Sequence, residues 1–458
     1  MELISPTDLI FLLGESREHA MHVGGLSLYE MPDDAGPDFV RELYEEIAAV
    51  KDFQPTFRKH PATLFGGITN AAWTYDDDVD LDYHLRRSAL PSPGRIRDLL
   101  ELTSRLHGTL MDRHRPLWEA HIIEGLPDRR FAVYTKVHHA LLDGVSALKL
   151  TERTLSTDPA DTTVRAPWAL PPQKRRRAPG GDSSPVGRLL RAVGDTAGSV
   201  IGLAPSTVKL ARAALLEQQL TLPFGAPKTM LNGKIGGARR VAAQTWPLER
   251  VRRIKRAAKV TVNDVVLAMC AGALRAYLIE QNGLPDAPLI AMVPVSLRSE
   301  SDANAGGNQV GAILCNLATD VEDPALRLAT IADSMAGNKK VFSELPKLQA
   351  LALSAALLSP LGLVMVPGVV GNTPPPFNVV ISNVPGSQKQ LYWKGARLTG
   401  NYPLSIAMDG QAVNITLVTN GDQLDFGIVG CRSSVPHLQR LLGHLEDSLK
   451  DLERAVGV

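Results

Sequence analysis

The sequence predicts an α/β protein in which mixed sheets are packed with helices. Strand-like and helix-like segments alternate irregularly in both halves of the chain, and a stretch rich in Pro, Gly and Ser separates the halves. The irregular order disfavours a barrel or a doubly wound sheet, each of which repeats one strand and helix unit. The 458 residues are 44% hydrophobic and 21% charged, which suits a globular chain of roughly two or three domains.

Two amphipathic helices are predicted early in the chain. Residues 39–52 place apolar side chains on one helical face, namely Val40, Leu43, Ile47 and Val50. Residues 97–113 repeat the pattern with Leu99, Leu102, Leu106 and Leu110. Strand-like, turn-rich sequence lies between them, and a further helix begins near Asp143.

Residues 156–185 lack any periodic pattern and are rich in Pro, Gly and Ser, so we interpret them as a linker. The predicted division is an N-terminal domain at 1–158, a linker and connecting helix at 159–228, and a C-terminal domain at 229–458. The linker contains the basic run Lys174 to Arg177. Such a block of like charges is usually solvated, although it could also contact anionic lipid headgroups.

The second half offers its own helices and strands. A helix with Val251 and Ile254 facing inward is followed by buried-strand candidates at 288–298 and 309–318. The dipeptide Asn420-Gly421 between two apolar runs predicts a hairpin. A terminal amphipathic helix carries five leucines in register, Leu438, Leu441, Leu445, Leu449 and Leu452.

Charge and cysteine content exclude several classes of protein. Lys and Arg number 49 and Asp and Glu 48, a net charge of +1 that argues against a nucleic-acid partner. The cysteines, at 270, 315 and 431, lack the close spacings of a zinc or redox motif and are expected as reduced, buried thiols. Because the first twenty residues lack a basic segment before their apolar part, a cytoplasmic protein is expected. The acidic run Asp76 to Asp82 lacks the Gly and Glu of a calcium loop, so no metal is expected.

An uncharged segment from Leu348 to Gln388 bears on membrane association. Its length would suit a transmembrane helix, but Pro360 and Pro367 interrupt it and further prolines follow. We therefore expect a protein that is peripheral to the inner membrane or to lipid droplets, and that does not span a bilayer.

The most specific chemical signal is the string HHALLDG at residues 138–144. Strand alternation through residues 131–139 places His139 on the face of Val133, Thr135 and Val137, and His138 on the opposite face. Asp143 stands where the strand gives way to a helix and could cap it. A single histidine with a capping aspartate is usually structural, but the combined pattern is far more specific.

His138, His139, Asp143 and Gly144 form the HHxxxDG motif and make the chain similar to the chloramphenicol-acetyltransferase-like superfamily, which includes peptide-synthetase condensation domains. Further motifs resemble the bacterial wax ester synthase/diacylglycerol acyltransferase family: Pro116-Leu117-Trp118, Asn263-Asp264, PVSLR ending at Arg298, GNQ at 307–309 and SNVPG at 382–386. The resemblance implies two domains of one α/β topology with an active-site channel at their interface. It also implies transfer of a fatty acyl group from acyl-CoA, as substrate rather than cofactor, to diacylglycerol or a long-chain alcohol.

The residue chemistry agrees with this implied activity. Attack of an alcohol on a thioester requires a base that removes the hydroxyl proton, and a neutral imidazole suits that task. The resemblance assigns the role to His139 and leaves His138 a supporting one. Because no G-x-S-x-G elbow occurs and no cysteine has a histidine nearby in sequence, direct transfer without an acyl-enzyme is expected.

Other site residues are implied by the resemblance. Asp143 is expected to orient the turn by pairing with Arg298, although it could merely cap the helix. The oxyanion of the tetrahedral intermediate needs a donor, for which Asn263 and a backbone N–H near Gly386 are candidates. Asp264 is a supporting residue, and the substrate contacts are expected from Pro116, Leu117, Trp118, Ser382, Asn383 and Gly386.

Two other functions remain open on the sequence alone. One is a condensation-type enzyme whose acyl donor is bound to a carrier protein, and the other is a non-catalytic lipid-surface protein that keeps the fold. A dense basic cluster could hold the CoA phosphates or simply form a solvated helix face; it comprises Arg250, Arg252, Arg253, Lys255, Arg256 and Lys259.

Overall fold

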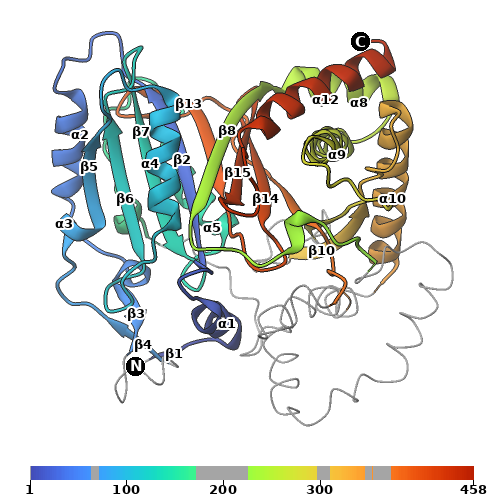
Figure 1. Ribbon diagram of the computed structural model, residues 1–458. Coiled ribbons are helices and arrows are strands. Elements are labelled where there is room, and N and C mark those ends of the chain that lie inside the picture. The colour runs from blue at the N-terminus through green and yellow to red at the C-terminus, as the bar shows by residue number, and fades with distance from the viewer. Residues whose placement is uncertain (1, 63–71, 172–224, 297–309, 346–352, 354–372) are drawn as a thin grey trace.

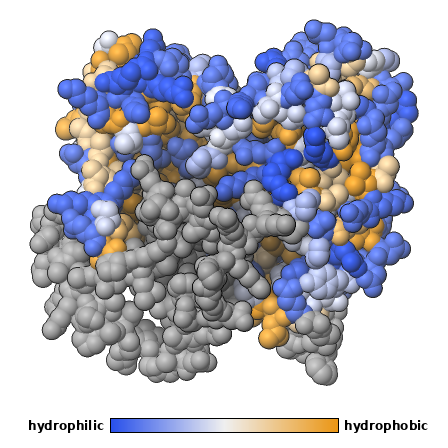
Figure 2. Space-filling model, turned by 180° about the vertical axis from the view of Figure 1, so that it is seen from behind, coloured by the Kyte–Doolittle hydropathy of each residue, from blue (hydrophilic) through white to orange (hydrophobic). Residues whose placement is uncertain are grey.

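The structure is a computed structural model, and it describes residues 2–62, 72–171, 225–296, 310–345, 353 and 373–458. Two six-stranded sheets, each covered by helices, form two lobes separated by a notch (Figures 1 and 2). This mixed α/β architecture confirms the predicted fold class.

The N-terminal sheet has the strand order β12-β13-β2-β7-β6-β5. Its strands are β2 (His22–Glu30), β5 (Leu85–Ala89), β6 (Trp118–Glu124), β7 (Arg130–His138), β12 (Tyr392–Trp393) and β13 (Ala396–Leu404). The pairs are antiparallel except for β5 with β6, which is parallel. A small separate sheet has the order β1-β4-β3, built from β1 (Glu2–Leu3), β3 (Lys59–Pro61) and β4 (Ala72–Tyr75).

Helices flank the N-terminal sheet on both faces (Figure 1). They are α1 (Pro6–Gly14), α2 (Phe39–Ala48), α3 (Leu81–His84), α4 (Ile96–Gly108) and α5 (Gly144–Thr154), with 3-10 turns η1 (Pro55–Arg58) and η3 (Pro167–Ala169). The two predicted amphipathic helices are therefore present, but both end earlier than expected. Val50 lies beyond α2 and Leu110 beyond α4, whose C-cap Thr109 is already extended.

The C-terminal sheet has the order β10-β9-β11-β14-β15-β8. Its strands are β8 (Arg239–Pro247), β9 (Ile290–Ser296), β10 (Val310–Asn316), β11 (Val379–Val384), β14 (Val413–Asn420) and β15 (Gln423–Cys431). The predicted hairpin joins β14 to β15, and its Gly421 adopts a positive φ of 61°, which glycine tolerates without strain. The two strand candidates of this half are β9 and β10.

The helices of the C-terminal lobe lie together on the side of the sheet away from the N-terminal lobe (Figure 1). They are α8 (Leu248–Ala258), α9 (Val262–Glu280), α10 (Pro324–Glu344) and α12 (Arg440–Val456), and the 3-10 turn η4 (Met230–Asn232) precedes β8. Among the described residues α9 alone is long and apolar enough to cross a membrane, but 72% of its window is buried, so it is the central core helix of this lobe. Leu441, Leu445, Leu449 and Leu452 of α12 pack against it, while Leu438 is buried just before the helix.

One crossover departs from the predicted division into contiguous domains. Strands β12 and β13 belong to the C-terminal half of the chain yet complete the N-terminal sheet, where β13 pairs with β2 and Asn401 lies opposite Ser27. The crossing strand passes very close to β15, because a Cβ at Gly427 would overlap the carbonyl oxygen of Pro403. Residues 229–458 therefore do not contribute to one sheet alone, and β13 connects the two lobes.

Candidate active site

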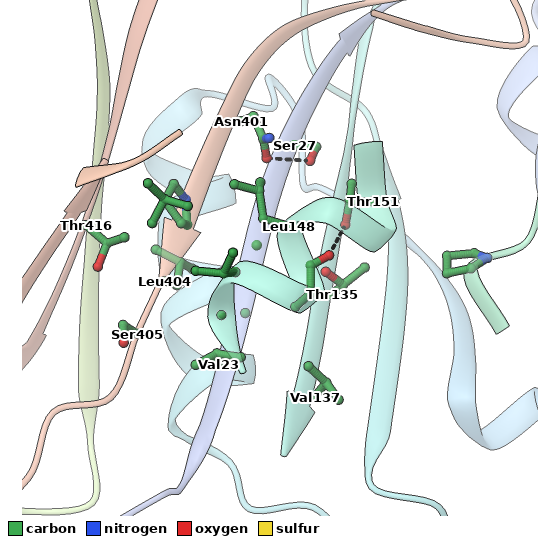
Figure 3. Close-up of a pocket in the computed structure, with 18 of the residues that line it drawn as sticks. Val23, Ser27, Thr135, Val137, Leu148, Thr151, Asn401, Leu404, Ser405 and Thr416 are labelled. Atoms are coloured by element: carbon green, nitrogen blue, oxygen red, sulfur yellow. Dashed lines mark hydrogen bonds between the residues drawn. The ribbon is translucent and has the colours of Figure 1, made fainter. Parts of the chain in front are cut away.

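A cavity of about 390 Å³ lies at the junction of the two lobes, between the N-terminal sheet and α5 (Figure 3). One row of residues forms the floor of the cavity. The row crosses five neighbouring strands of the sheet, and each residue in it lies directly opposite the next: Pro403, Gly25, Thr135, Ala120 and Leu85. Its roof is α5, whose Ala147, Leu148 and Thr151 line it. The small residues Gly25 and Ala120 turn this row into a trough across the sheet.

The two ends of the cavity differ in chemistry. Towards β5 the walls form an apolar arm, made by Ile47, Leu85, Ala120, Ile122 and Trp168. Towards the C-terminal lobe they form a polar arm, made by Ser382, Asn401, Ser405, Asn414 and Thr416. In Figure 3 the polar-arm residues Thr416 and Ser405 lie to one side of α5, which itself carries Leu148 and Thr151.

His139 lines the cavity just after β7 ends, on the face shared by Val133, Thr135 and Val137, as alternation predicts. Its backbone N–H donates to the carbonyl oxygen of Met21 at 2.9 Å. The ring of Phe11 from α1 stacks on the imidazole, with centroids 4.1 Å apart and planes 19° apart. The stacked phenyl ring covers one face of the imidazole, and the residue still lines the cavity.

The protonation state of His139 suits a base. Burial lowers its pKa below the ordinary 6.5, and Asp143, which acts in the opposite direction, does not offset this. The ring also hydrogen-bonds its own backbone carbonyl, which only Nδ1 can reach, so Nδ1 carries the proton of the neutral ring. Nε2 is then the unprotonated nitrogen, and it can accept a proton.

His138 faces the other side of the sheet and is 1% exposed. Its Nδ1 accepts from the N–H of Ala140 at 3.1 Å, which places the ring proton on Nε2, 3.5 Å from Oε1 of Glu15. Burial alone would raise the pKa of Glu15, but His138 and Arg113 outweigh it and hold that pKa below its ordinary value. His138 therefore braces the turn from behind and does not line the cavity.

Asp143 is the N-cap of α5 and also lines the cavity. Its Oδ1 accepts from the backbone N–H of Ser146 at 2.7 Å and its Oδ2 from the hydroxyl of the same residue at 3.1 Å. Gly144 follows as the first helical residue and also lines the cavity. Arg298, the predicted partner of Asp143, lies outside the described residues, so that pairing stays a prediction.

The SNVPG and ND motifs meet across the C-terminal lobe. Ser382 lines the polar arm, and the amide of Asn383 donates to Oδ1 of Asn263 at 3.5 Å. Asp264 does not line the cavity: it is buried and accepts from the backbone N–H and hydroxyl of Thr261 at the start of α9. It thereby fixes the helix end that carries Asn263.

The Pro116, Leu117 and Trp118 segment lies in the core and not on the cavity wall. Leu117 is fully buried, and its carbonyl oxygen accepts from the N–H of His138 at 3.0 Å. Trp118 is covered by Trp168, whose indole stacks on it at 5.2 Å. Pro116, Leu117 and Trp118 are not among the residues that line the cavity, whereas Trp168 is, and substrate contact by this segment stays a prediction.

Several functional positions escaped the sequence reasoning. Phe11 and Glu15 reach the histidine pair from α1, and Trp168 comes from the segment interpreted as linker. Glu152 of α5 accepts from the N–H of Ser387 at 2.8 Å and so joins the two lobes beside the SNVPG motif. A signal for α1 was present, since Ser5 and Pro6 mark a helix start, but nothing local tied that helix to His139.

Some members of the charged clusters singled out in the sequence form ion pairs within the structure. Arg250 of α8 pairs with Glu446 and Glu453 of α12, and Arg256 pairs with Glu249. In the acidic run, Asp80 caps α3 and pairs with Arg115 at 2.8 Å. Within the described ranges, no group of three or more His, Cys, Asp or Glu residues is placed to hold a metal ion.

Comparison with known proteins identifies the family. The model of the wax ester synthase/diacylglycerol acyltransferase catalytic domain matches residues 4–266, and the model of the WS/DGAT C-terminal domain matches residues 306–453. The chain belongs to the wax ester synthase/diacylglycerol acyltransferase family. It is 68% identical, over the full length of both chains, to a Mycobacterium tuberculosis protein named as a probable diacyglycerol O-acyltransferase, tgs2.

More distant relatives and solved structures support the same family assignment. The O-acyltransferase WSD of Acinetobacter baylyi is 40% identical over 100% of this chain and 98% of its own. The solved wax ester synthase/diacylglycerol acyltransferase of Marinobacter aquaeolei VT8 superposes with a TM-score of 0.81 at 40% identity, covering both chains completely. The first condensation domain of the calcium-dependent antibiotic synthetase, with a TM-score of 0.58 at 18% identity over 99% of this chain and 96% of that one, shares the fold. The chain is accordingly an acyltransferase of the WS/DGAT family.

Proposed function

We propose that the protein transfers a fatty acyl group from acyl-CoA to diacylglycerol, to a long-chain alcohol or to both, with His139 as general base. The observation that carries the proposal is the placement of His139: it lines a cavity that has an apolar arm suited to a chain and a polar arm suited to ester and hydroxyl groups.

The proposed reaction has two steps. Nε2 of His139 takes the hydroxyl proton as the alcohol oxygen attacks the thioester carbonyl carbon. The tetrahedral intermediate then expels the CoA thiolate, which receives the proton from the imidazolium, so the base is regenerated. The polar groups of the ND and SNVPG motifs, Asn263 and the backbone near Gly386, are proposed to stabilise the oxyanion.

Direct transfer is favoured over a covalent acyl-enzyme. The three cysteines are buried, and burial raises the pKa of Cys270 and of Cys315 to about 12, so neither supplies a thiolate near neutral pH. Cys431 lies beside Ser433 and Gly236, away from the residues that line the cavity. Acyl-CoA and acceptor are then expected to be bound at the same time.

The test is turnover by purified protein. Palmitoyl-CoA is offered with dipalmitoylglycerol or hexadecanol, and CoA release and ester formation are measured. We expect His139→Ala to lower kcat by ~10²–10⁴, as loss of a general base does. His138→Ala should cost less, because that ring braces the turn without lining the cavity. Equal activity of wild type and His139→Ala would refute the mechanism, and turnover only with a carrier-bound acyl donor would favour the condensation-type alternative.

We further propose that the protein acts at the cytoplasmic face of the inner membrane or on lipid droplets without spanning a bilayer. The acceptors are water-insoluble, and the apolar helix α9 is the core of its lobe. Most of the uncharged stretch from Leu348 to Gln388 lies outside the described residues. Washing membranes with high salt and with alkaline carbonate tests this: release is expected, and extraction only by detergent would show an integral segment.

A further inference from the structure

We infer that the apolar arm receives the acyl chain of the donor and that Trp168, carried by the segment between the lobes, limits how long that chain can be. The inference rests on the proposed function and adds to it the residue that selects among acyl-CoA substrates.

The position of Trp168 follows from the strand register. Trp118 and Ala120 are two residues apart on β6 and therefore face the same side of the sheet. Trp118 lies opposite Val137, and Ala120 lies opposite Thr135 and Leu85, both of which line the cavity. Because the indole of Trp168 stacks on Trp118 (5.2 Å between centroids), it lies beside the trough at the level of Val137, where it forms part of the wall of the apolar arm.

The side chain of Trp168 is held rigidly. The indole N–H of Trp168 donates to the carbonyl oxygen of Val50 at 2.8 Å, and the carbonyl oxygen of Trp168 accepts from the N–H of Gln54 at 2.8 Å. The ring of Phe53 stacks on Trp168, with centroids 6.0 Å apart. Trp168 is 1% exposed, and these contacts hold its side chain in place. A rigid wall of this kind can discriminate between chains that differ by a few methylenes.

The length of the arm fits one long acyl chain. From His139 to the Thr135 level is about 13 Å along β7, and from β7 to β5 is about 10 Å across the sheet, so the diagonal path is about 16 Å. The hydrocarbon core of a bilayer is ~30 Å thick and holds two layers of acyl chains, which gives about 15 Å for one chain. The path from His139 to Leu85, which lines the same arm as Trp168, is therefore about as long as one acyl chain of a membrane lipid.

The donor chain fits this arm better than an acceptor does. The whole cavity, about 390 Å³, is small among ligand pockets, and its apolar arm is lined by Leu85 and Trp168 among others. Acyl-CoA brings a single alkyl chain, whereas diacylglycerol brings two. The polar arm on the other side of His139 offers hydroxyl and amide groups, which suit the glycerol and ester oxygens of the acceptor and not a methylene chain.

The experiment compares chain-length profiles. The kcat/KM of wild type and Trp168→Ala is measured for acyl-CoA from C12 to C22 with one alcohol, and then for alcohols of C8 to C20 with palmitoyl-CoA. Trp168→Ala should raise the kcat/KM for the C20 donor, relative to that for the C16 donor, about tenfold. This is the effect of burying roughly two additional methylenes. The alcohol profile should stay as in wild type.

A second variant keeps the inference testable if Trp168→Ala folds poorly. Ala120→Leu fills the middle of the trough. It should therefore lower the kcat/KM for the C16 donor, relative to that for the C12 donor, about tenfold. Trp246→Leu is the matched control: it also removes a buried indole, but in the C-terminal core, and should leave both profiles unchanged.

The outcomes separate the two proposals. Donor profiles that do not move in folded, active variants would overturn the role of Trp168, and movement of the alcohol profile alone would assign the arm to the acceptor. Absence of turnover by wild type with every acyl-CoA would instead refute the proposed function.

Discussion

The adjacent histidines have opposite surroundings, and those surroundings decide what each can do. His139 faces a cavity under a stacked phenyl ring, with its Nε2 unprotonated. His138 is tied to Ala140 and Glu15 on the far face of the sheet. Glu15 also accepts from the N–H of Met21, whose carbonyl oxygen holds the backbone of His139, so one carboxylate braces both residues.

Phe11 is predicted to tune the basicity of His139. The phenyl ring excludes water from one face of the imidazole, and burial is the main cause of the lowered pKa of His139. The base is active when unprotonated, so a lowered pKa keeps it active at lower pH. Phe11→Ala should hydrate the ring and raise that pKa, which moves the acid limb of kcat/KM to higher pH.

The pH profile distinguishes tuning from a merely structural role. Asp143 and His138 act on His139 in opposite directions and remain in the variant, so the shift reports Phe11 alone. Leu13→Ala is the control, because Leu13 lies on the same helix but is 73% exposed. An acid limb that stays in place in Phe11→Ala, with lower activity at every pH, would leave Phe11 only a packing role.

Sequence reasoning reached part of this site. Alternation along one strand and the capping chemistry of one turn placed His139 and Asp143 correctly, because both arguments are local. It missed Phe11, Glu15 and Trp168, since these approach from elements far away in the chain. It also assigned substrate contact to Trp118, which a second tryptophan covers.

At the scale of elements, α5 connects the site to the second lobe. It begins at the cap Asp143, roofs the cavity, and near its end Glu152 accepts from the N–H of Ser387. The residue before that contact is Gly386, where a Cβ would overlap the carbonyl oxygen of Thr419 and the side chain of Val418. The absence of a side chain at Gly386 thus lets the SNVPG turn lie against β14.

Gly386→Ala should therefore displace this turn. We expect a loss of about 1–3 kcal/mol of stability, as for other overpacked sites, together with reduced turnover because the turn carries a proposed oxyanion donor. Gly233→Ala is the matched control, since a Cβ there meets nothing within 4 Å. Thermal unfolding and kcat are the measurements, and equal behaviour of the two variants would contradict the steric argument.

The contact between α8 and α12 bears on how CoA is bound. Arg250 is paired with both Glu446 and Glu453, so its charge is already neutralised within the lobe. Arg250→Ala should lower the unfolding temperature and leave the KM for acyl-CoA unchanged, because the pairing is structural. A raised KM at unchanged stability would restore the role in binding CoA phosphates that the sequence left open.

At the scale of the whole molecule, the crossover strand β13 is what makes one site from two lobes. It supplies Asn401, which accepts from the hydroxyl of Ser27 at 3.3 Å on one side and donates its backbone N–H to Asp425 at 2.6 Å on the other. The sequence predicted two α/β layers but not this exchange. Its alternation is equally consistent with either sheet, and only long-range pairing decides which sheet it joins.

Asp425 should make the stability of this junction depend on pH. It is fully buried, and burial raises its pKa to about 6 from 3.8 although Thr245, Asn401 and Asn420 all donate to it. Between pH 3.8 and 6 the folded chain then binds more protons at this residue than the unfolded chain. Stability from this group is therefore greatest at low pH and falls by roughly 3 kcal/mol as pH rises through that window.

Comparison with Asp425→Asn isolates the contribution, because every other group titrates alike in both proteins. The unfolding temperature of wild type minus that of the variant should be largest near pH 4 and should shrink towards pH 7.5. Asp422→Asn, at an exposed position in the same hairpin, is the control for the Asp-to-Asn substitution itself. A wild-type advantage that instead grows towards neutral pH would mean that the three donors stabilise the carboxylate more than burial destabilises it. In that case the ionised form of Asp425, and not the protonated one, would be what joins β13 to β15.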